Sequence, residues 1–278
     1  LVVSAVTCGQ RYQGGCAYIF ERNESGVWVE KLKLESEDPL PNNYARIVDV
    51  SGDTILVSNG DSSRDAEVYI RDEAGTWLKQ TTLTPSDFAY VGVAQAIDNN
   101  RIALSGTDTN RELWRVYIYE SDGFGAWTEQ AILTPNDGSG AKLAYQVTLL
   151  NDVLLVGDWE GRLHIFVRDA IGNWEQHDQL SDDFLRKPAR VANTDNIILV
   201  GNSYDDPNGA ECGAALAFVR QSDGDLGGKV NIVASDGSDY DEFGDALALT
   251  NTHAIIGAAR HNSGDDAGTG AVYVYEIN

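Results

Sequence analysis

Residues 116–127 read VYIYESDGFGAW, an apolar run rich in aromatic residues that is followed by a turn containing glycine and then by Trp127. Alternating β-branched and aromatic residues are typical of a β-strand, and Asp and Gly are typical of the turn that follows. Trp127 is then expected to begin the next strand of an antiparallel hairpin. The same order of strand, turn and tryptophan occurs elsewhere in the chain, and the spacing of these copies decides the fold.

The copies of this pattern are evenly spaced. The tryptophans that lead the second strand of each hairpin lie 49, 50 and 47 residues apart, at Trp28, Trp77, Trp127 and Trp174. Two weaker copies follow at 216–219 and 272–275, without a tryptophan after the strand. Regular spacing of this length is typical of repeat architectures, among them β-propellers.

Each repeat contains more strands than this hairpin. An apolar run precedes every aromatic strand, at 1–6, 54–57, 102–104, 153–156, 197–200 and 254–256. A further run of alternating polarity precedes five of these, at 45–50, 91–97, 145–150, 189–192 and 244–249. We interpret each repeat as a four-stranded antiparallel meander. The repeats cover approximately 1–40, 41–88, 89–138, 139–183, 184–236 and 237–278.

A lone meander cannot bury both faces of its sheet, whereas sheets stacked radially can. The sequence therefore predicts a single all-β domain, 1–278, folded as a β-propeller of six four-stranded blades. The first repeat lacks its innermost strand and the last lacks its outermost, so we expect these strands to precede Leu1 in the full protein or to come from another chain. A pair of β-sandwiches and a seven-bladed parent are the alternatives.

The charge of the chain excludes some classes of partner. Its 278 residues include 20 Lys or Arg and 43 Asp or Glu, which gives a net charge of −23. Proteins that bind phosphate groups need a basic surface to displace counterions, so neither nucleic acid nor an anionic membrane surface is expected as a partner. No run of 18 apolar residues is present, and no membrane insertion is expected.

The chain has three cysteines. Cys8 and Cys16 flank a glycine-rich loop between two apolar runs, where a disulfide would cross the mouth of a hairpin. A structural metal site needs four ligands, which one cysteine pair and a distant thiol do not provide. We therefore predict a disulfide between Cys8 and Cys16, which favours an oxidising compartment. Cys212 is either free or paired outside the chain.

The last repeat contains Phe243-Gly244, then Ile256-Gly257-Ala258-Ala259, then the aromatic strand at 270–275. This arrangement resembles the FG-GAP repeat, the unit of the integrin α-subunit propeller and of many secreted or surface proteins. Earlier repeats keep only the glycine of the second motif, as at Gly157 and Gly201. The resemblance implies a propeller and an extracellular location, either secreted or at the cell surface.

Calcium-binding FG-GAP repeats, which this repeat resembles, have an Asp-x-Asp-x-Asp-Gly loop between the first two strands. That spacing surrounds one cation with oxygen ligands. Here those turns are short and have too few carboxylates, as at 51–53 and 98–100. We therefore expect no calcium and no other cofactor. A weaker Ca²⁺ candidate is the acidic cluster of Asp236, Asp239 and Asp241, which we interpret as part of a solvated acidic loop.

In a meander of this kind the connections after the second and fourth strands lie on one face, and here they are long. Binding residues concentrate in long loops on a rigid scaffold. Trp28, Trp77, Trp127 and Trp174 keep one register and are interpreted as wedges between blades. Trp114 and Trp159 break the repeat and are expected in long loops, where aromatic residues stack on sugars or anchor proteins. The candidate binding residues are Trp114, Trp159, Tyr12, Arg11, Tyr204, Arg260 and His261.

No catalytic motif occurs in the sequence. A Gly-x-Ser-x-Gly elbow, a P-loop and a His-Glu-x-x-His pair are all absent from it. His164 replaces the tyrosine of the repeat and is interpreted as a core residue. We therefore expect a non-catalytic extracellular recognition or adhesion module that binds protein or glycan through the long-loop face. The alternatives are a building block of a larger extracellular assembly, engaged through its incomplete ends and Cys212, and a sialidase- or lyase-like enzyme.

Overall fold

The computed structural model describes residues 1–5, 8, 15–35, 44–45, 47–58, 65–87, 90–108, 110, 113–136, 138, 146–158, 160–181, 190–207, 209–220, 226–262 and 268–277. Every regular element in these residues is a β-strand, which confirms the all-β class. None of them belongs to a helix that is long and apolar enough to cross a membrane. The chain divides into two compact units, Leu1–Leu149 and Leu150–Asn278.

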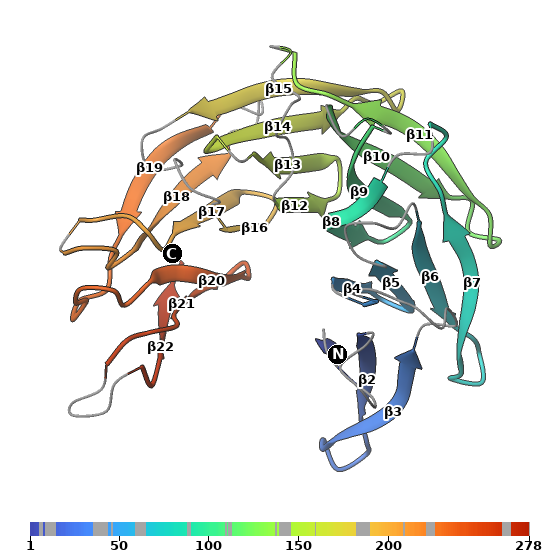
Figure 1. Cartoon of the computed structure of the whole chain (residues 1–278), viewed down its shortest axis with the longest axis horizontal. Coiled ribbons are helices and arrows are strands. Elements are labelled where there is room, and N and C mark those ends of the chain that lie inside the picture. Colours follow the sequence, from blue (N-terminus) through green and yellow to red (C-terminus); the bar gives the residue numbers. More distant parts are fainter. Residues whose placement is uncertain are drawn as a thin grey trace. The chain divides into compact units, whose positions relative to one another are not determined.

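The first unit contains three antiparallel sheets, each with its strands in chain order (Figure 1). The first sheet has three strands, β1 (Val2–Ala5), β2 (Cys16–Arg22) and β3 (Trp28–Glu35). The second has four, β4 (Val48–Ser51), β5 (Thr54–Ser58), β6 (Ala66–Arg71) and β7 (Trp77–Leu83). The third also has four, β8 (Tyr90–Asp98), β9 (Arg101–Thr107), β10 (Trp114–Ser121) and β11 (Trp127–Leu133).

Three further sheets follow, and the boundary between the units falls at the end of β12. The fourth sheet is β12 (Gln146–Leu150), β13 (Val153–Gly157), β14 (Arg162–Arg168) and β15 (Trp174–Ser181). The fifth is β16 (Arg190–Asn193), β17 (Ile197–Asn202), β18 (Ala214–Arg220) and β19 (Leu226–Ile232). The sixth has three strands, β20 (Phe243–Leu249), β21 (His253–Ala258) and β22 (Ala271–Glu276).

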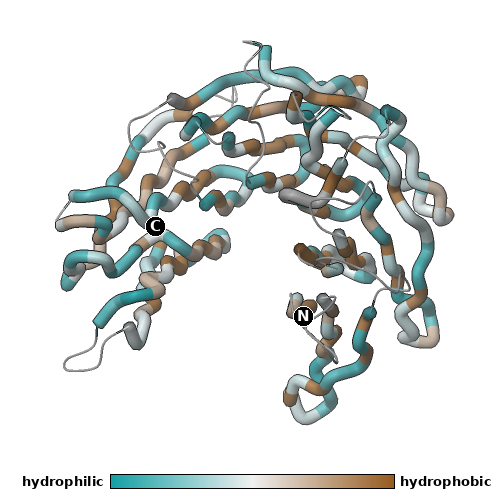
Figure 2. The backbone as a smooth tube through the Cα atoms, viewed as in Figure 1, coloured by the Kyte–Doolittle hydropathy of each residue, from teal (hydrophilic) through white to brown (hydrophobic). Residues whose placement is uncertain are grey.

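The apolar core lies between successive sheets within each unit. Leu56, Ala66 and Val68 of the second sheet pack against Ile102 and Leu104 of the third, while the opposite face of the second sheet packs against the first. Apolar residues accordingly form continuous buried runs in inner strands of both units, as at 55–57 of β5 and 153–156 of β13 (Figure 2). A sheet that is buried on both faces by its neighbours is a propeller blade and not a layer of a sandwich. The chain is therefore an all-β propeller of six blades, and the first and sixth blades are incomplete, as predicted.

Glycines bring consecutive sheets into backbone contact. A Cβ atom added to Gly15, just before β2, would lie 1.8 Å from the carbonyl oxygen of Tyr44. One added to Gly213, just before β18, would lie 2.0 Å from the carbonyl oxygen of Phe243. Tyr44 and Phe243 are buried, and each is followed by a residue with positive φ, Ala45 (53°) and Gly244 (95°). At both places, therefore, a buried aromatic residue followed by a residue with positive φ stands at or before the first strand of one sheet. Its carbonyl lies against a glycine of the preceding sheet. β4 begins at Val48 and not at residue 45 as expected, and Ala45 has a left-handed conformation that is unfavourable for a residue other than glycine.

A recurring turn sets the position of the repeated tryptophans. Its first residue is Asp or Asn, whose Oδ1 accepts a hydrogen bond from the backbone N–H four residues later. The glycine of the turn has a positive φ of 77 to 109°, which residues other than glycine rarely adopt. The outer strand then begins with tryptophan. The four turns begin at Asn23, Asp72, Asp122 and Asp169.

Two of these tryptophans join neighbouring sheets. Trp77 packs on the core between the first and second sheets, and its Nε1 donates to Glu21 Oε1 on β2 at 3.1 Å. Trp127 packs between the second and third sheets, and its Nε1 donates to Gln80 Oε1 on β7 at 2.9 Å. The predicted role as a wedge is confirmed for both. Trp28 stands at the same register in the first sheet, but it is 47% exposed and lies under the guanidinium of Arg22.

One polar cluster is enclosed in the fourth sheet. The Asp158 carboxylate receives Arg162 Nε at 2.6 Å and lies 3.2 Å from His164 Nε2, and both Asp158 and His164 are buried. Burial acts to raise the pKa of Asp158, but the hydrogen bonds from His164 and from Arg162 outweigh it and hold that pKa below its usual value. His164 is thus a buried core residue, as expected from the sequence.

Replacement of Trp77 tests the wedge. Trp77→Ala is expected to lower the free energy of unfolding by about 2–3 kcal/mol, because it removes a packed ring and the donor to Glu21. Trp28→Ala is the matched control and is expected to cost less than about 1 kcal/mol, because that ring is half exposed. Urea unfolding followed by circular dichroism measures both, and equal losses would contradict the wedge.

Replacement of Asp158 tests the enclosed cluster. Asp158→Asn is expected to destabilise the protein by about 2–4 kcal/mol at pH 7, because His164 and Arg162 lose their carboxylate. A lowered carboxyl pKa contributes stability above the unfolded pKa of about 4 and loses it as the pH falls through the folded value. The difference from the wild type should therefore be constant from pH 7 to 5 and shrink below pH 4. Asp53→Asn, at an exposed turn, is the control, and a difference that persisted to pH 3 would refute the assignment.

Candidate functional site

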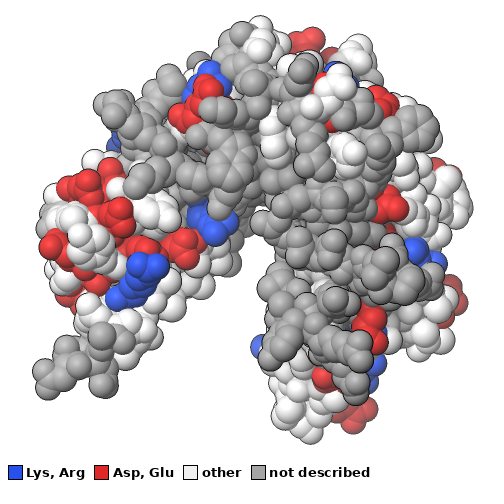
Figure 3. Space-filling view, in the orientation of Figure 1, with Lys and Arg blue, Asp and Glu red and all other residues white. Residues whose placement is uncertain are grey.

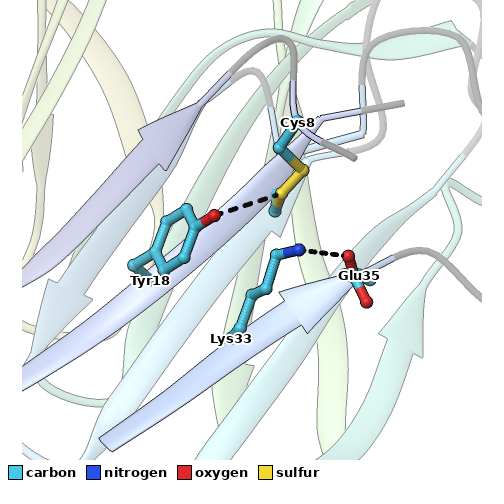
Figure 4. Close-up of a disulfide and its surroundings, with 5 residues drawn as sticks. Cys8, Tyr18, Lys33 and Glu35 are labelled. Carbon is cyan, nitrogen blue, oxygen red and sulfur yellow. Dashed lines mark hydrogen bonds and ion pairs between the residues drawn. A yellow bond between two sulfur atoms is a disulfide. The ribbon is translucent and has the colours of Figure 1, made fainter. Parts of the chain in front are cut away.

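The predicted disulfide is present. Cys8 and Cys16 are bonded with their Cα atoms 6.0 Å apart, at the start of β2 (Figure 4). Tyr18 Oη lies 4.0 Å from Cys16 Sγ, and Lys33 pairs with Glu35 beside it on β3. The hydrogen bond to Glu35 raises the pKa of Lys33. The third cysteine, Cys212, is free and buried, so its thiol is not presented on the surface of the second unit.

Three connections of the second unit are joined into one surface, which we call the loop platform. It consists of 203–207 and 209–213 between β17 and β18, 233–242 between β19 and β20, and 259–262 after β21. Tyr240 N donates to Ala210 O at 2.7 Å, and Glu242 N donates to Glu211 O at 3.2 Å. Arg260 N donates to Asp241 O at 3.2 Å. These are the long connections that the sequence placed on a common face, and main-chain hydrogen bonds hold them together.

A histidine between two carboxylates lies at the centre of the platform. His261 Nδ1 is 2.9 Å from Asp241 Oδ2, and Asp241 also accepts the backbone N–H of Ser238 at 2.8 Å. The other ring nitrogen, Nε2, lies 3.9 Å from Asp236 Oδ2. The contact with Asp241 orients the ring through Nδ1, whereas the distance from Nε2 to Asp236 is too long for a hydrogen bond.

The outer carboxylate of this cluster is also held by a phenol. Tyr273 Oη donates to Asp236 Oδ1 at 2.7 Å, and this hydrogen bond holds the pKa of Asp236 below its usual value. Burial and the hydrogen bond to Asp236 raise the pKa of Tyr273. The Asp241 side chain is fully buried, and its Oδ1 has no hydrogen-bond partner among the described residues. The cluster therefore ties the β21–β22 connection to the β19–β20 connection.

Two exposed aromatic residues stand on the platform. Tyr204, predicted as a candidate, is 40% exposed, and Tyr240 is 55% exposed. Tyr240 has a φ of 67°, a left-handed conformation that costs a non-glycine residue about 1 kcal/mol or more. The hydrogen bond to Ala210 keeps it there. No sequence signal singled out Tyr240, because it lies inside an acidic stretch that is typical of a solvated loop.

Acidic residues dominate the charge of the platform. Asp205, Asp206, Glu211, Asp236 and Asp239 belong to it, together with Asp241 and Glu242. The predicted candidate Arg260 is their cationic neighbour, with its Nε 3.2 Å from Glu242 Oε1 and its side chain 66% exposed. Figure 3 shows Asp and Glu side chains gathered on the left of the view, with Lys and Arg beside them. The platform therefore offers carboxylates, two phenols and one guanidinium to solvent.

The structure corrects the placement of Trp114. It was expected in a long loop, but it is the first residue of β10, where it pairs with Thr107 and is half-buried. The ladder between β9 and β10 continues farther than the apolar pattern indicated, because Ser105, Gly106 and Thr107 remain extended. Trp114 is therefore not a loop residue. The other candidates Arg11, Tyr12 and Trp159 lie outside the described residues.

The three carboxylates proposed as a weak Ca²⁺ site have separate partners. Asp239 Oδ1 accepts from Ala210 N at 3.0 Å, whereas Asp241 faces His261 and Asp236 faces Tyr273. In the described part of the chain, the group of three that has the spacing of metal ligands is Cys8, Cys16 and Glu35. Its sulfurs form the disulfide, so they are not available as thiolate ligands.

The solved structures that resemble this chain share little of its sequence. No curated protein matches the chain by sequence. Among solved structures, the computationally designed Ika8 protein is similar at 12% identity, with a TM-score of 0.50, 90% of this chain covered and 76% of that chain. A periplasmic gluconolactonase of Pseudomonas aeruginosa, PpgL, is similar at 13% identity, with a TM-score of 0.44, 86% of this chain covered and 83% of that chain.

A family model, described as the FG-GAP repeat, matches residues 228–275. The match runs from β19 to β22 and includes the two motifs on which the resemblance rested, Phe243-Gly244 and Ile256-Gly257-Ala258-Ala259. The part of the chain from β19 to β22 is therefore similar to an FG-GAP repeat, in a chain that folds as an all-β propeller.

Proposed function

We propose that the protein is a non-catalytic extracellular recognition module that binds a protein or a glycan through the loop platform. The observation that carries the proposal is the exposure of Tyr204 and Tyr240 on loops that main-chain hydrogen bonds hold in place. Exposed aromatic side chains with few rotatable bonds are the usual anchors of protein and sugar recognition. Binding to loops that are already ordered avoids much of the entropic cost of fixing them.

The chemistry of the platform supports binding in preference to catalysis. Asp239 is held by a backbone N–H, and Arg260 is paired with Glu242. An enzyme of the sialidase or lyase kind instead requires carboxylates or arginines that converge on a substrate with their reactive atoms available. The exposed carboxylates suit a partner that presents Lys, Arg or hydroxyl groups.

The disulfide supports an extracellular location. A disulfide between Cys8 and Cys16 forms and persists in an oxidising environment, which supports secretion or display at the cell surface. With a net charge of −23, the protein is not proposed to bind nucleic acid or to insert into a membrane.

A structural role in a larger extracellular assembly is the second candidate. It is favoured by the three-stranded first and sixth sheets, whose neighbours have four strands. Neighbouring chains would then complete these sheets. Cys212 is buried, so this role would rest on the sheets and not on a disulfide through that residue.

Replacement of the platform tyrosines tests the proposed binding. The whole chain is screened against a glycan array and a panel of cell-surface ectodomains, and each hit is measured by biolayer interferometry. Tyr204→Ala and Tyr240→Ala are each expected to weaken binding by about 30-fold, the loss that corresponds to about 2 kcal/mol for a central aromatic anchor.

The matched control is Phe124→Ala, because Phe124 is 97% exposed in the turn between β10 and β11 of the first unit. That variant is expected to bind as the wild type does. The proposal is wrong if every hit keeps its affinity in the Tyr204→Ala, Tyr240→Ala double variant, if neither panel gives a hit, or if a hit is chemically converted by the protein.

A further inference from the structure

The turn between β2 and β3 differs from the other three recurring turns in its first residue. It reads NESGV at 23–27, just before Trp28, whereas the equivalent turns begin with aspartate. Asn-x-Ser, where x is not proline, is a sequence to which an N-linked glycan is attached. Residues 23–25 are the only stretch of the chain with this sequence or with threonine in the third place. The sequon therefore falls on a turn whose geometry the repeat defines.

The turn engages only one of the two polar atoms of the Asn23 side chain. Oδ1 accepts the backbone N–H of Ser25 at 3.0 Å and that of Val27 at 2.9 Å. In the part of the chain that the structure describes, no group forms a hydrogen bond with the amide nitrogen Nδ2. The turn thus fixes the amide group through its oxygen and leaves the nitrogen toward solvent.

Other exposed asparagines use this nitrogen inside the protein. Asn173 Nδ2 donates to Asp169 Oδ2 at 3.2 Å in the fourth turn, and Asn99 Nδ2 donates to Asp98 Oδ1 at 3.1 Å. A glycan acceptor requires the opposite arrangement, because the sugar replaces one of the two hydrogens on Nδ2. Asn23 has that arrangement.

The second side chain of the sequon is also available. No described residue forms a hydrogen bond with the hydroxyl of Ser25, and only its backbone N–H is used, as the donor to Asn23. The equivalent third residues of the other turns have no hydroxyl group. They are Ala74, Phe124 and Ile171.

The tip of the turn has room for a bulky substituent. Residues 23–27 are all exposed, and a Cβ atom added to Gly26 would meet no atom within 4 Å. Asp72, the equivalent of Asn23 in the second sheet, is exposed although the first and third sheets pack against both faces of that sheet. The tip of this turn therefore stays in solvent even where a blade is covered on both faces. Exposure of Asn23 does not depend on what covers the first sheet.

From these features we infer that Asn23 is the attachment site of an N-linked glycan. The donor is an oligosaccharide carried on a lipid diphosphate. Nδ2 forms a bond to C1 of the first sugar, the bond between C1 and the diphosphate oxygen breaks, and the lipid diphosphate leaves while Nδ2 loses one proton. Oδ1 is unchanged by this transfer, so both hydrogen bonds of the turn can persist in the glycosylated chain.

This inference rests on the extracellular location proposed above, because N-linked glycans are carried by surface loops of secreted proteins. It does not involve the loop platform. β2 begins at Cys16, in the disulfide, and ends at Arg22, just before the sequon. The glycan would therefore project from the end of the β2–β3 hairpin opposite the disulfide.

Mass spectrometry of the secreted chain tests the inference. The intact chain is expressed in cultured human cells behind an added secretion signal, and the medium and the cell lysate are both analysed. The folded protein is treated with peptide N-glycosidase in heavy-oxygen water, which leaves a labelled aspartate where a glycan was attached. Trypsin then cleaves after Arg22 and Lys31 and gives the peptide NESGVWVEK, 23–31. The label is expected at residue 23 in most molecules, and no denaturant should be needed because the turn is exposed.

Three variants at the sequon separate the acceptor from the turn. Ser25→Ala removes the hydroxyl but keeps the backbone N–H that donates to Asn23, and it should abolish the glycan. Ser25→Thr keeps a hydroxyl and should keep the glycan. Asn23→Asp should abolish the glycan and unfold at the same urea concentration as the unglycosylated Ser25→Ala variant, because Asp72 supports the same turn.

The matched control is Asp72→Asn. It presents the same amide group in an equivalent exposed turn, but Ala74 stands in the third place, so no glycan is expected at residue 72. The inference is overturned if residue 23 is unlabelled in the wild type from both medium and lysate, if Ser25→Ala keeps the glycan, or if release requires denaturant. Because the added signal supplies the location, these outcomes are distinct from a failure of the proposed binding, which the variants of Tyr204 and Tyr240 measure.

Discussion

The contact on which the rest of each unit depends is a backbone carbonyl resting on the Cα of a glycine. At Gly15 and Gly213 a single methyl group would lie within about 2 Å of a carbonyl of the next sheet. No real Cβ is tolerated at that distance, so the approach of two sheets requires glycine at these positions. The approach in turn sets the depth of the core, because Phe243 and Tyr44 reach full burial only when their backbones lie this close.

The same contact organises the surface above it. The hydrogen bonds of Tyr240, Glu242 and Phe243 to Ala210, Glu211 and Cys212 form a continuous series. This series leads from the loops to the contact between Gly213 and Phe243. The loop platform is therefore an extension of the contact between the fifth and sixth sheets. This continuity explains how residues in left-handed conformations, Glu211, Tyr240 and Glu242, are held in place at one location. A local strain of this kind persists only where the surrounding hydrogen bonds determine the backbone.

Local chemistry made most of the fold predictable. The turns from Asp72 and Asp122 place a tryptophan at a constant distance from a carboxylate and a glycine, so the period was visible without any knowledge of contacts. The contacts between consecutive sheets, such as that of Gly15 with Tyr44, were harder to predict because their residues vary. Tyr44-Ala45 takes the place of Phe243-Gly244, but an alanine in a left-handed conformation has no signature in the sequence. Trp114 was misplaced because its neighbours Gly106 and Thr107 read as the end of a strand that in fact continues.

The candidate site depends on contacts that the spacing of the repeats does not determine. His261 and Asp241 are twenty residues apart, in connections of irregular length. Only the folded arrangement of these connections brings the two side chains within hydrogen-bonding distance. His261 could be named from its position on the long-loop face. Its partners could not, because Asp236, Asp239 and Asp241 are equivalent in the sequence and differ only in what each one faces.

The recurring turn has a consequence for the acidity of the chain. In three of the four turns described, an aspartate oxygen accepts the backbone N–H four residues later at 2.7 to 3.0 Å, and in the first turn the amide oxygen of Asn23 does the same at 2.9 Å. The turn uses the oxygen as an acceptor and does not require its charge. Substitution between Asp and Asn can therefore shift the isoelectric point of such a protein without altering its architecture. The net charge of −23 is in this sense a property that can evolve with the surroundings of the protein, independently of the blades that carry it.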